Sequence, residues 1–405
     1  MDPKVRARGG AGAVLVVLFT GAFAMGCAEM LVMGIIDLIA ADLAITVPAA
    51  GVLVTAYALG VALGGPVLAF LTAPLDRRSV LLGAAALFVL LNLAPVVAPD
   101  YRLFVATRVC VGAVQGLFIA AALTAATSVV PPDRAGRAMG TVISGFAAAS
   151  ALGLPMGALV GQHLGWQASL LAIVGVGVVV LLAARLSLPS IPAAGTRGAG
   201  EQLRHALAPR VLAVLALCCL VFAGVQSALT YLVPYLGDTA GVSGPAVAFF
   251  LLAFGIATTL GSAAGGRFAD VHAVRALVVG TVGLTVALLF MYVFGAHAPV
   301  AFLAVVGVGL FAMGLAPAMQ TRVMGLAGPG AALAAALPAS AASAGDAVGA
   351  LLGGVAIARS GLAAAVLTGA VIAAAAVGVS VATRHLRPPQ VTEKSESPSP
   401  DTIDA

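Results

Sequence analysis

The chain has 405 residues, of which 61% are hydrophobic and only 9% are charged, and its mean hydropathy is +1.13. Soluble domains carry about 25% charged residues, so this composition excludes an ordinary soluble protein. The four cysteines and five histidines show no spacing typical of a metal site or a disulfide framework.

A helix that crosses a bilayer needs about 20 apolar residues, and twelve runs of that kind follow one another along the chain. Runs of this length favour helices over barrel strands, which alternate over about ten residues. We therefore predict an all-α membrane protein with twelve transmembrane helices. The runs cover roughly residues 11–36, 47–73, 79–97, 102–130, 138–162, 166–187, 209–234, 243–266, 275–296, 298–321, 332–358 and 361–382.

The first run contains a single ionised residue, Glu29. A carboxylate in hydrocarbon costs at least a few kcal/mol unless it finds a partner, a proton or a water-filled cavity, and it marks a proton or substrate site by default. The fourth run contains Arg108 and the eleventh contains Asp346, while Asp37 closes the first run. These four residues are the candidates for a central site.

A polar stretch divides the twelve runs into six and six. We predict an N-terminal half over 1–187, a cytoplasmic linker over 188–208, a C-terminal half over 209–383 and a disordered cytoplasmic tail over 384–405. With the N-terminus in the cytoplasm, every Lys and Arg except Arg102, Arg108 and Arg359 falls on the cytoplasmic side. This positive-inside bias predicts that both termini are cytoplasmic. The basic charge is thus explained by topology, and we expect no nucleic-acid partner.

The two halves repeat two features. The loop after the second run pairs Thr72 with Asp270 and Arg77 with Arg275 in the loop after the eighth run. Glycines recur every four residues in the fifth and eleventh runs, at Gly153, Gly157 and Gly161 and at Gly345, Gly349 and Gly353. Each trio lines one helix face on which a neighbour can pack closely. Repeated halves are typical of transporters that rock around a central site. The alternative is that the glycine trios match by chance, because the chain contains 49 glycines.

These motifs resemble the major facilitator superfamily, and specifically its twelve-helix drug:proton antiporters. The resemblance covers all twelve runs. The first-half loop resembles the superfamily's cytoplasmic loop motif through Gly64, Gly65, Pro66, Arg77 and Arg78, and the second-half loop through Asp270 and Arg275. The fourth run resembles the motif built on a membrane-embedded arginine through Arg108, Gly112 and Gly116. The fifth run resembles the antiporter motif through Gly145, Gly153, Pro155, Gly157 and Gly161.

The segment GCAEMLVMGIIDLIAADL resembles a bacterial subgroup that includes chloramphenicol exporters and sugar or nucleoside efflux proteins. The chain departs from the family pattern at several positions. Thr72 stands where the loop motif has an acid, Asp37 where the subgroup has proline, and Asp346 where relatives have a small or amide residue. Glu29, Asp37 and Asp346 are therefore three candidates for the residue that carries the proton.

The resemblance implies that the first and fourth helices line a central cavity, so we expect a Glu29–Arg108 pair. An apolar cavity makes a carboxylate harder to ionise and a nearby arginine opposes this, so a balanced acid can load and release a proton. The alternative is a structural ion pair between the two helices. Asp346 either faces the cavity or lies within the close packing beside Gly345 and Gly349.

Six further residues are predicted to line a drug cavity: Tyr57, Phe222, Gln226, Tyr231, Phe254 and Gln320. Trp166 is predicted to be an interfacial anchor rather than a ligand residue.

The sequence favours a proton-coupled exporter of a small amphipathic drug, with chloramphenicol-like antibiotics first among the substrates. The alternative is an exporter of a sugar, nucleoside or other small metabolite. We expect no enzymatic activity, no metal and no cofactor beyond the proton gradient. The expected partners are a small-molecule substrate, protons and the lipid bilayer, for a monomer in the bacterial inner membrane.

Overall fold

The computed structural model describes residues 3–131, 134–190, 207–328, 334 and 337–386, and the regular structure in these ranges is helical. Twelve segments in the described ranges are long and apolar enough to cross a membrane, which confirms the predicted number. Most of the predicted linker and tail lie outside the described residues, at 191–206 and 387–405.

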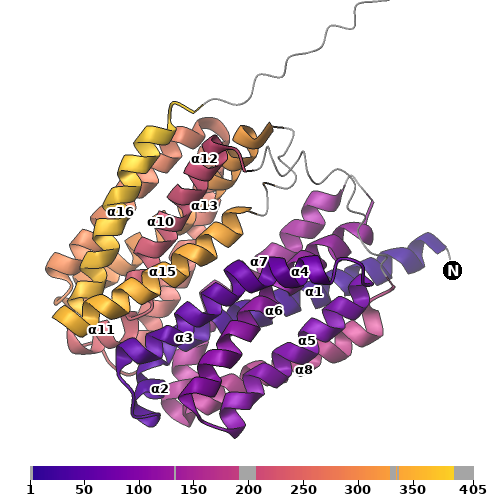
Figure 1. Cartoon of the computed structure of the whole chain (residues 1–405), viewed down its shortest axis with the longest axis horizontal. Coiled ribbons are helices and arrows are strands. Elements are labelled where there is room, and N and C mark those ends of the chain that lie inside the picture. The colour runs from indigo at the N-terminus through magenta and orange to yellow at the C-terminus, as the bar shows by residue number, and fades with distance from the viewer. Residues whose placement is uncertain (1–2, 132–133, 191–206, 329–333, 335–336, 387–405) are drawn as a thin grey trace, which may run out of the picture.

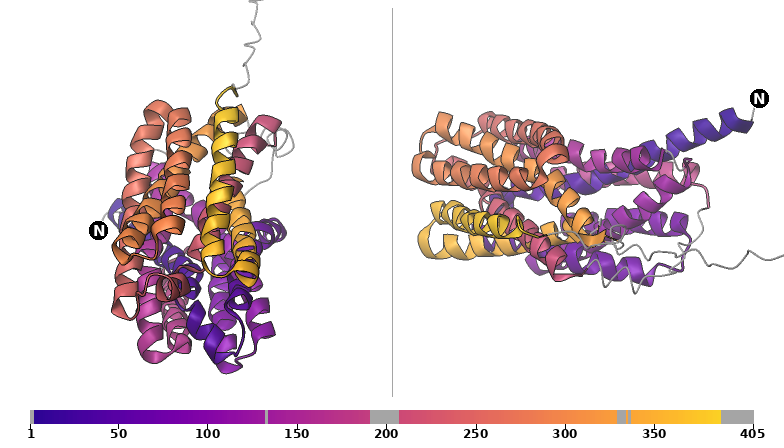
Figure 2. Two further views of the ribbon diagram at one scale, coloured as in Figure 1. Left: turned by 90° about the vertical axis from the view of Figure 1, so that its left-hand side faces the viewer. Right: turned by 90° about the horizontal axis from the view of Figure 1, so that it is seen from above.

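The helices form two bundles that lie side by side (Figure 1). The first contains α1 (Pro3–Gly34), α2 (Ile36–Asp42), α3 (Val47–Leu59), the π-helical turn η1 (Gly60–Gly64), α4 (Gly65–Leu71), α5 (Arg77–Val97), α6 (Tyr101–Ser128), α7 (Ala135–Leu164) and α8 (Trp166–Ser187). The second contains α10 (Pro209–Leu229), α11 (Leu232–Asp238), α12 (Pro245–Phe294), α13 (Ala298–Ala327), α15 (Leu337–Ser360) and α16 (Ala363–Thr383). Figure 2 shows the same division from two other directions.

In two places the spans do not correspond one to one with the helices. The second span runs without a break through α3, η1 and α4. The long helix α12 contains two spans, Pro245–Ala269 and Val271–Phe294, which meet at His272. His272 has φ −143° and ψ 56°, so the chain turns between the spans at one non-helical residue, within a shorter connection than the apolar runs predict.

Short polar side chains begin several of the helices. Thr46 accepts a hydrogen bond from the amide of Ala49 at the start of α3, and Asp100 accepts one from the amide of Leu103 at the start of α6. Such caps satisfy amides that have no partner within the helix. The connections therefore define where spans begin, while the apolar runs define their length.

The glycine trios lie where two helices approach closely in each half. The trio of α7 faces α1, and the trio of α15 faces α10. A Cβ atom at Gly153 would lie 3.1 Å from the Cα of Cys27, and one at Gly353 would lie 2.7 Å from the carbonyl oxygen of Ser227. Larger residues would separate these helices.

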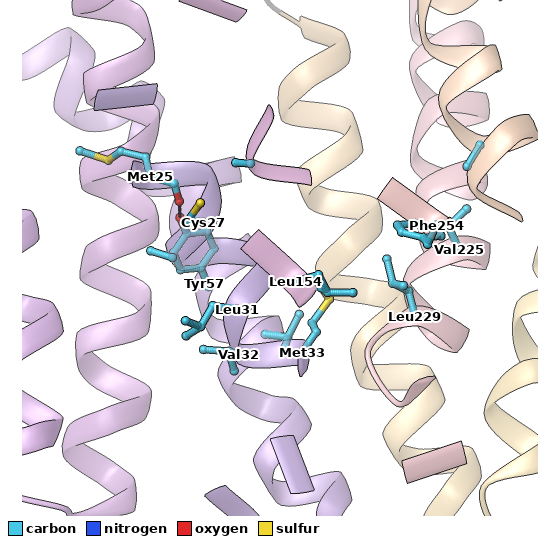
Figure 3. Packing of buried hydrophobic residues seen from close by; sticks show 14 of the residues in the cluster. Met25, Cys27, Leu31, Val32, Met33, Tyr57, Leu154, Val225, Leu229 and Phe254 are labelled. Carbon is cyan, nitrogen blue, oxygen red and sulfur yellow. Dashed lines mark hydrogen bonds between the residues drawn. The ribbon is translucent and has the colours of Figure 1, made fainter. Parts of the chain in front are cut away.

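Several pairs of helices join the two halves. α3 packs against α15, α7 packs against α12, and both α1 and α2 approach α11. Tyr231, at the start of α11, lies on this boundary, where its hydroxyl donates to the carbonyl of Ala350 at 2.9 Å and its ring faces Gly51 of the first half. Figure 3 shows Met33 and Leu154 of the first half on the side that faces Leu229 and Phe254 of the second.

Candidate functional site

Glu29 lies in α1, about one helical turn before Met33, and its side chain is half-buried. Its Oε2 accepts a hydrogen bond of 2.8 Å from Nε2 of Gln115 on α6. The carboxylate thus has a neutral amide as its hydrogen-bonding partner, within a span whose other neighbours are mostly apolar.

Tyr57 of α3 connects this pair to the rest of the site. Its hydroxyl lies within hydrogen-bonding distance of Oε1 of Gln115 and of the carbonyl oxygen of Met25, 3.3 Å away. Figure 3 shows Tyr57 directed toward the backbone of Met25. Tyr57 and Gln115 are 2% and 3% exposed, so bulk water does not compete for these bonds.

Arg108 of α6 lies against the ring of Tyr57 and is 1% exposed. Its Nη2 donates to the carbonyl oxygen of Ala28 at 2.7 Å, and its guanidinium carbon lies 4.4 Å from the centre of the Tyr57 ring, a cation–π contact. Its Nε and Nη1 are buried and have no hydrogen-bond partner. Arg108 and Glu29 are close enough to interact electrostatically.

The expectation of a direct Glu29–Arg108 ion pair is wrong for this structure. The two residues lie at matching depths, as the sequence indicates, but the carboxylate contacts Gln115 and the guanidinium contacts Ala28. The stack of Arg108 on Tyr57, and the Gln115 amide beside it, account for this separation. The result is a four-residue cluster from three helices, which we call the polar cluster: Glu29, Tyr57, Arg108 and Gln115.

Asp346 approaches the polar cluster from the second half. Its neighbours Gly345 and Gly349 pack against Cys219 and Ala223 of α10, so Asp346 lies at the level of those residues. On α10, one turn beyond Ala223, Gln226 donates to the sulfur of Met33 at 3.1 Å. Because Glu29 is one turn before Met33, the two acids lie at neighbouring levels, and they interact electrostatically. Asp346 is thus half-buried beside the packed glycines and interacts with Glu29 of the other half.

Asp37 does not join the polar cluster. It lies in α2, two turns beyond Glu29, and its side chain is half-buried. Burial raises the pKa of its carboxyl group, and hydrogen bonds from backbone amides partly offset that effect. The helix that carries Asp37, α2, lies where the first half approaches α11.

The six predicted cavity residues are placed in different surroundings. Tyr57 belongs to the polar cluster, Gln226 bridges the halves, and Tyr231 is buried at their boundary. Phe254 lines a small apolar pocket between helices of the second half. Phe222 is partly buried on α10, and Gln320 is partly buried on α13. The structure thus does not bring all six together at one surface.

The loop-motif residues make packing and backbone contacts and do not bond to the polar cluster in the contacts described. A Cβ atom at Gly64 or Gly65 would meet Ala113 or Gly116 of α6, so these glycines are packing positions. Arg77 is 7% exposed and donates to the carbonyl of Ala73, and Arg78 donates to the carbonyl of Arg185 at 2.9 Å. In the second half Arg275 is exposed, and of Asp270 the structure describes the backbone alone.

The predicted antiporter motif forms the contact between α7 and α1. Gly145, Gly153 and Gly157 each face residues of that helix, Gly161 faces Ile35 and Leu38 just beyond it, and Pro155 lies within α7. An apolar cavity of about 80 Å³ between α1, α7 and α8 borders Gly153 and Gly157. The motif therefore shapes helix packing in this structure.

Gln115, Asp42 and Trp166 have roles that the sequence analysis did not assign. Trp166 is 2% exposed, stacks on Phe104 and donates from its indole nitrogen to Asp42 at 2.8 Å. It is an internal packing residue, so its prediction as an interfacial anchor is wrong. Gln115 could have been singled out as one of few amides within the spans, but its partner is visible only in three dimensions.

No group of three or more His, Cys, Asp or Glu residues in the described ranges could hold a metal ion. Two helical bundles, with a half-buried acid near their boundary and a buried arginine beside it, are the architecture of a secondary transporter. The family model of the Major Facilitator Superfamily matches residues 18–332 and 215–402. The chain belongs to this superfamily and is a multi-pass membrane transporter rather than an enzyme.

The relatives of this chain include named exporters. It is 34% identical over 346 residues to a chloramphenicol resistance protein of Streptomyces lividans, covering 84% of this chain and 87% of the relative. It is 33% identical over 355 residues to a chloramphenicol efflux pump of Mycobacterium tuberculosis, covering 85% and 86%. It is 30% identical over 344 residues to the inner membrane transport protein YdhP of Escherichia coli, covering 85% and 88%.

Among solved structures, the chain is similar to a bacterial homologue of the lysosomal transporter Spinster. The TM-score is 0.78 at 15% identity, covering 95% of this chain and 98% of that one. This similarity supports the fold.

Proposed function

We propose that this chain is a proton-coupled exporter of small amphipathic drugs in the bacterial inner membrane, with chloramphenicol-like antibiotics as the first substrates to test. The observation that carries the proposal is the position of Glu29. It is a half-buried acid at the boundary between the halves, bonded to a neutral amide and adjacent to a buried arginine. Such a residue gains and loses a proton more readily than one in a tight ion pair.

The coupling follows from alternating access. When the site faces outward, Glu29 takes up a proton, and when it faces inward, Glu29 releases the proton and the substrate binds. Each proton that moves down the membrane potential supplies about 2.3 kcal/mol per 100 mV. Arg108 stays charged, so it tunes the acid and does not carry the proton.

The substrate class is supported by the relatives. Two of them are named for chloramphenicol resistance or efflux and cover most of the chain. The orientation with both termini in the cytoplasm rests on the distribution of Lys and Arg. We propose that the monomer is the working unit, because its two halves already form the boundary at which Glu29 lies.

The direct test is drug resistance in a bacterium that lacks its major efflux pumps. We expect expression of the chain to raise the inhibitory concentration of chloramphenicol, and a protonophore to cancel this effect. Glu29→Gln should abolish the resistance at normal membrane expression, while Asp238→Asn, at an exposed acid of α11, should preserve it. Full resistance in Glu29→Gln would refute the coupling role. Absence of resistance in the wild type would favour export of a sugar, nucleoside or other metabolite.

A further inference from the structure

The amide of Gln115 is held at both of its ends. Its Nε2 donates to Glu29 at 2.8 Å, and its Oε1 lies against the hydroxyl of Tyr57. An amide has distinct donor and acceptor ends, so a hydroxyl donor at Oε1 keeps the NH₂ group directed at the carboxylate. The site therefore fixes the orientation of this side chain as well as its position.

Arg108 offers the same carboxylate a second set of donors. Its Nη2 already bonds to the carbonyl of Ala28, the residue that precedes Glu29, so the guanidinium lies beside the backbone of the acid. Its Nε and Nη1 are buried and unpartnered. Buried donors without a partner are uncommon and costly. The N–H of Nε points away from Nη1, so these atoms lie on different edges of the guanidinium, and each is a separate donor that a carboxylate can accept from.

We infer that Gln115 is a positioning residue that keeps the carboxylate of Glu29 on a neutral amide and off the unpartnered N–H groups of Arg108, and that Glu29 exchanges between these two partners during transport. The inference rests on the proposed function, because it concerns the same proton carrier. On the amide the carboxylate lacks a full counter-charge at hydrogen-bonding distance and accepts a proton readily. On the guanidinium the ionised form is held by a charge-assisted pair.

Few other titratable groups lie close enough to Glu29 to act as its partner. Tyr57 on α3, Arg108 on α6, Asp346 on α15 and Cys27 on α1 itself are the titratable groups near Glu29. The other helices packed against α1 carry these titratable groups within the described ranges: Arg137 and His163 near the ends of α7, Arg185 near the end of α8, and Tyr235 and Asp238 on the short helix α11.

The test is an infrared pH titration of the full-length protein in lipid nanodiscs, which needs no substrate. The carboxyl band of Glu29 is identified as the one lost in Glu29→Gln. In Gln115→Met the side chain keeps its length but loses the amide, so the carboxylate passes to Arg108. We expect the midpoint of the Glu29 band to fall by about one pH unit.

Tyr57→Phe provides a milder second variant. It keeps the ring on which Arg108 stacks and removes the hydroxyl that orients the Gln115 amide. The midpoint of the Glu29 band should therefore fall by less than in Gln115→Met. This variant tests the inference even where Gln115→Met does not fold. An unchanged or raised midpoint in folded variants would overturn the positioning role and leave the proposed function intact. Absence of any titrating Glu29 band in the wild type would overturn both.

Discussion

The glycines of the second span pack against the fourth span in the same way in both halves. Gly60 faces Val109 in the first half, and Gly261 faces Leu310 in the second. One turn further along, Gly64 faces Ala113 and Gly265 faces Gly314 in the same way. The two halves therefore share their helix packing residue by residue in this region.

In the register of these glycine contacts, one member of the polar cluster has a polar counterpart in the second half, where Thr258 stands at the position of Tyr57. The register of these glycine contacts places Gly309 of α13 at the position of Arg108, and Ala316 at that of Gln115. The register of the glycine trios pairs Glu29 with Val221 and Asp346 with Leu154. The repeat thus preserves helix packing while the chemistry is asymmetric: the four residues of the polar cluster lie in one half, and a single acid, Asp346, interacts with them from the other.

The largest expected effect tests whether the packing is equivalent. Gly345→Leu should prevent α15 from seating against the backbone of Cys219, and Gly153→Leu should separate α7 from Cys27. Overpacking of this kind costs about 1–3 kcal/mol or more. We expect both variants to lose transport and to melt several degrees lower, and Gly345→Leu to be the worse because it meets a backbone carbonyl.

The matched control for these variants is Gly378→Leu, because no atom lies within 4 Å of a Cβ at Gly378. Thermal unfolding of the purified proteins and transport in vesicles are the measurements. A stable and active Gly345→Leu protein, beside an inactive Gly153→Leu protein, would show that the two trios are not equivalent.

A smaller effect tests whether the chemistry is asymmetric. Asp346 faces Glu29 across the boundary, and no hydrogen-bonded cluster surrounds it comparable to that of Glu29. We expect Asp346→Asn to reduce export by about fivefold, the effect of about 1 kcal/mol, while Glu29→Gln abolishes it. Initial rates of proton-driven drug efflux from vesicles measure both. The reverse order of severity would move the proton site to the second half.

The sequence predicts the framework of the molecule better than its site. The lengths of the apolar runs predict the twelve spans, and the four-residue glycine period predicts the tight faces of α7 and α15. Both are properties of one helix at a time. The loop alignment, in contrast, misses that Gly64 corresponds to Gly265 in the helix contacts, because the loops differ in length.

The partners within the polar cluster depend on how each helix is rotated, which a uniformly apolar sequence does not reveal. Depth along the helices brought Glu29 and Arg108 to the same level. It could not show that Tyr57 and Gln115 lie beside both of them. The same uncertainty scattered the six predicted cavity residues over several surroundings.

The smallest effect concerns the short helices that follow the first span of each half, α2 and α11. Burial raises the pKa of Asp37 above the ordinary value of 3.8, so the folded protein disfavours its ionised form. Its contribution to stability is then complete at low pH and is lost as the pH rises from about 4 through the folded-state value. Asp37→Asn should remove this loss and raise the melting temperature by roughly 1–2 °C at neutral pH but not in acid. The matched change in the other half is Asp238→Asn, at the exposed acid of α11.

Melting curves of the wild type, Asp37→Asn and Asp238→Asn between about pH 4 and 7 measure the difference. Parallel curves for the wild type and Asp37→Asn would mean that the two short helices do not differ in their response to pH.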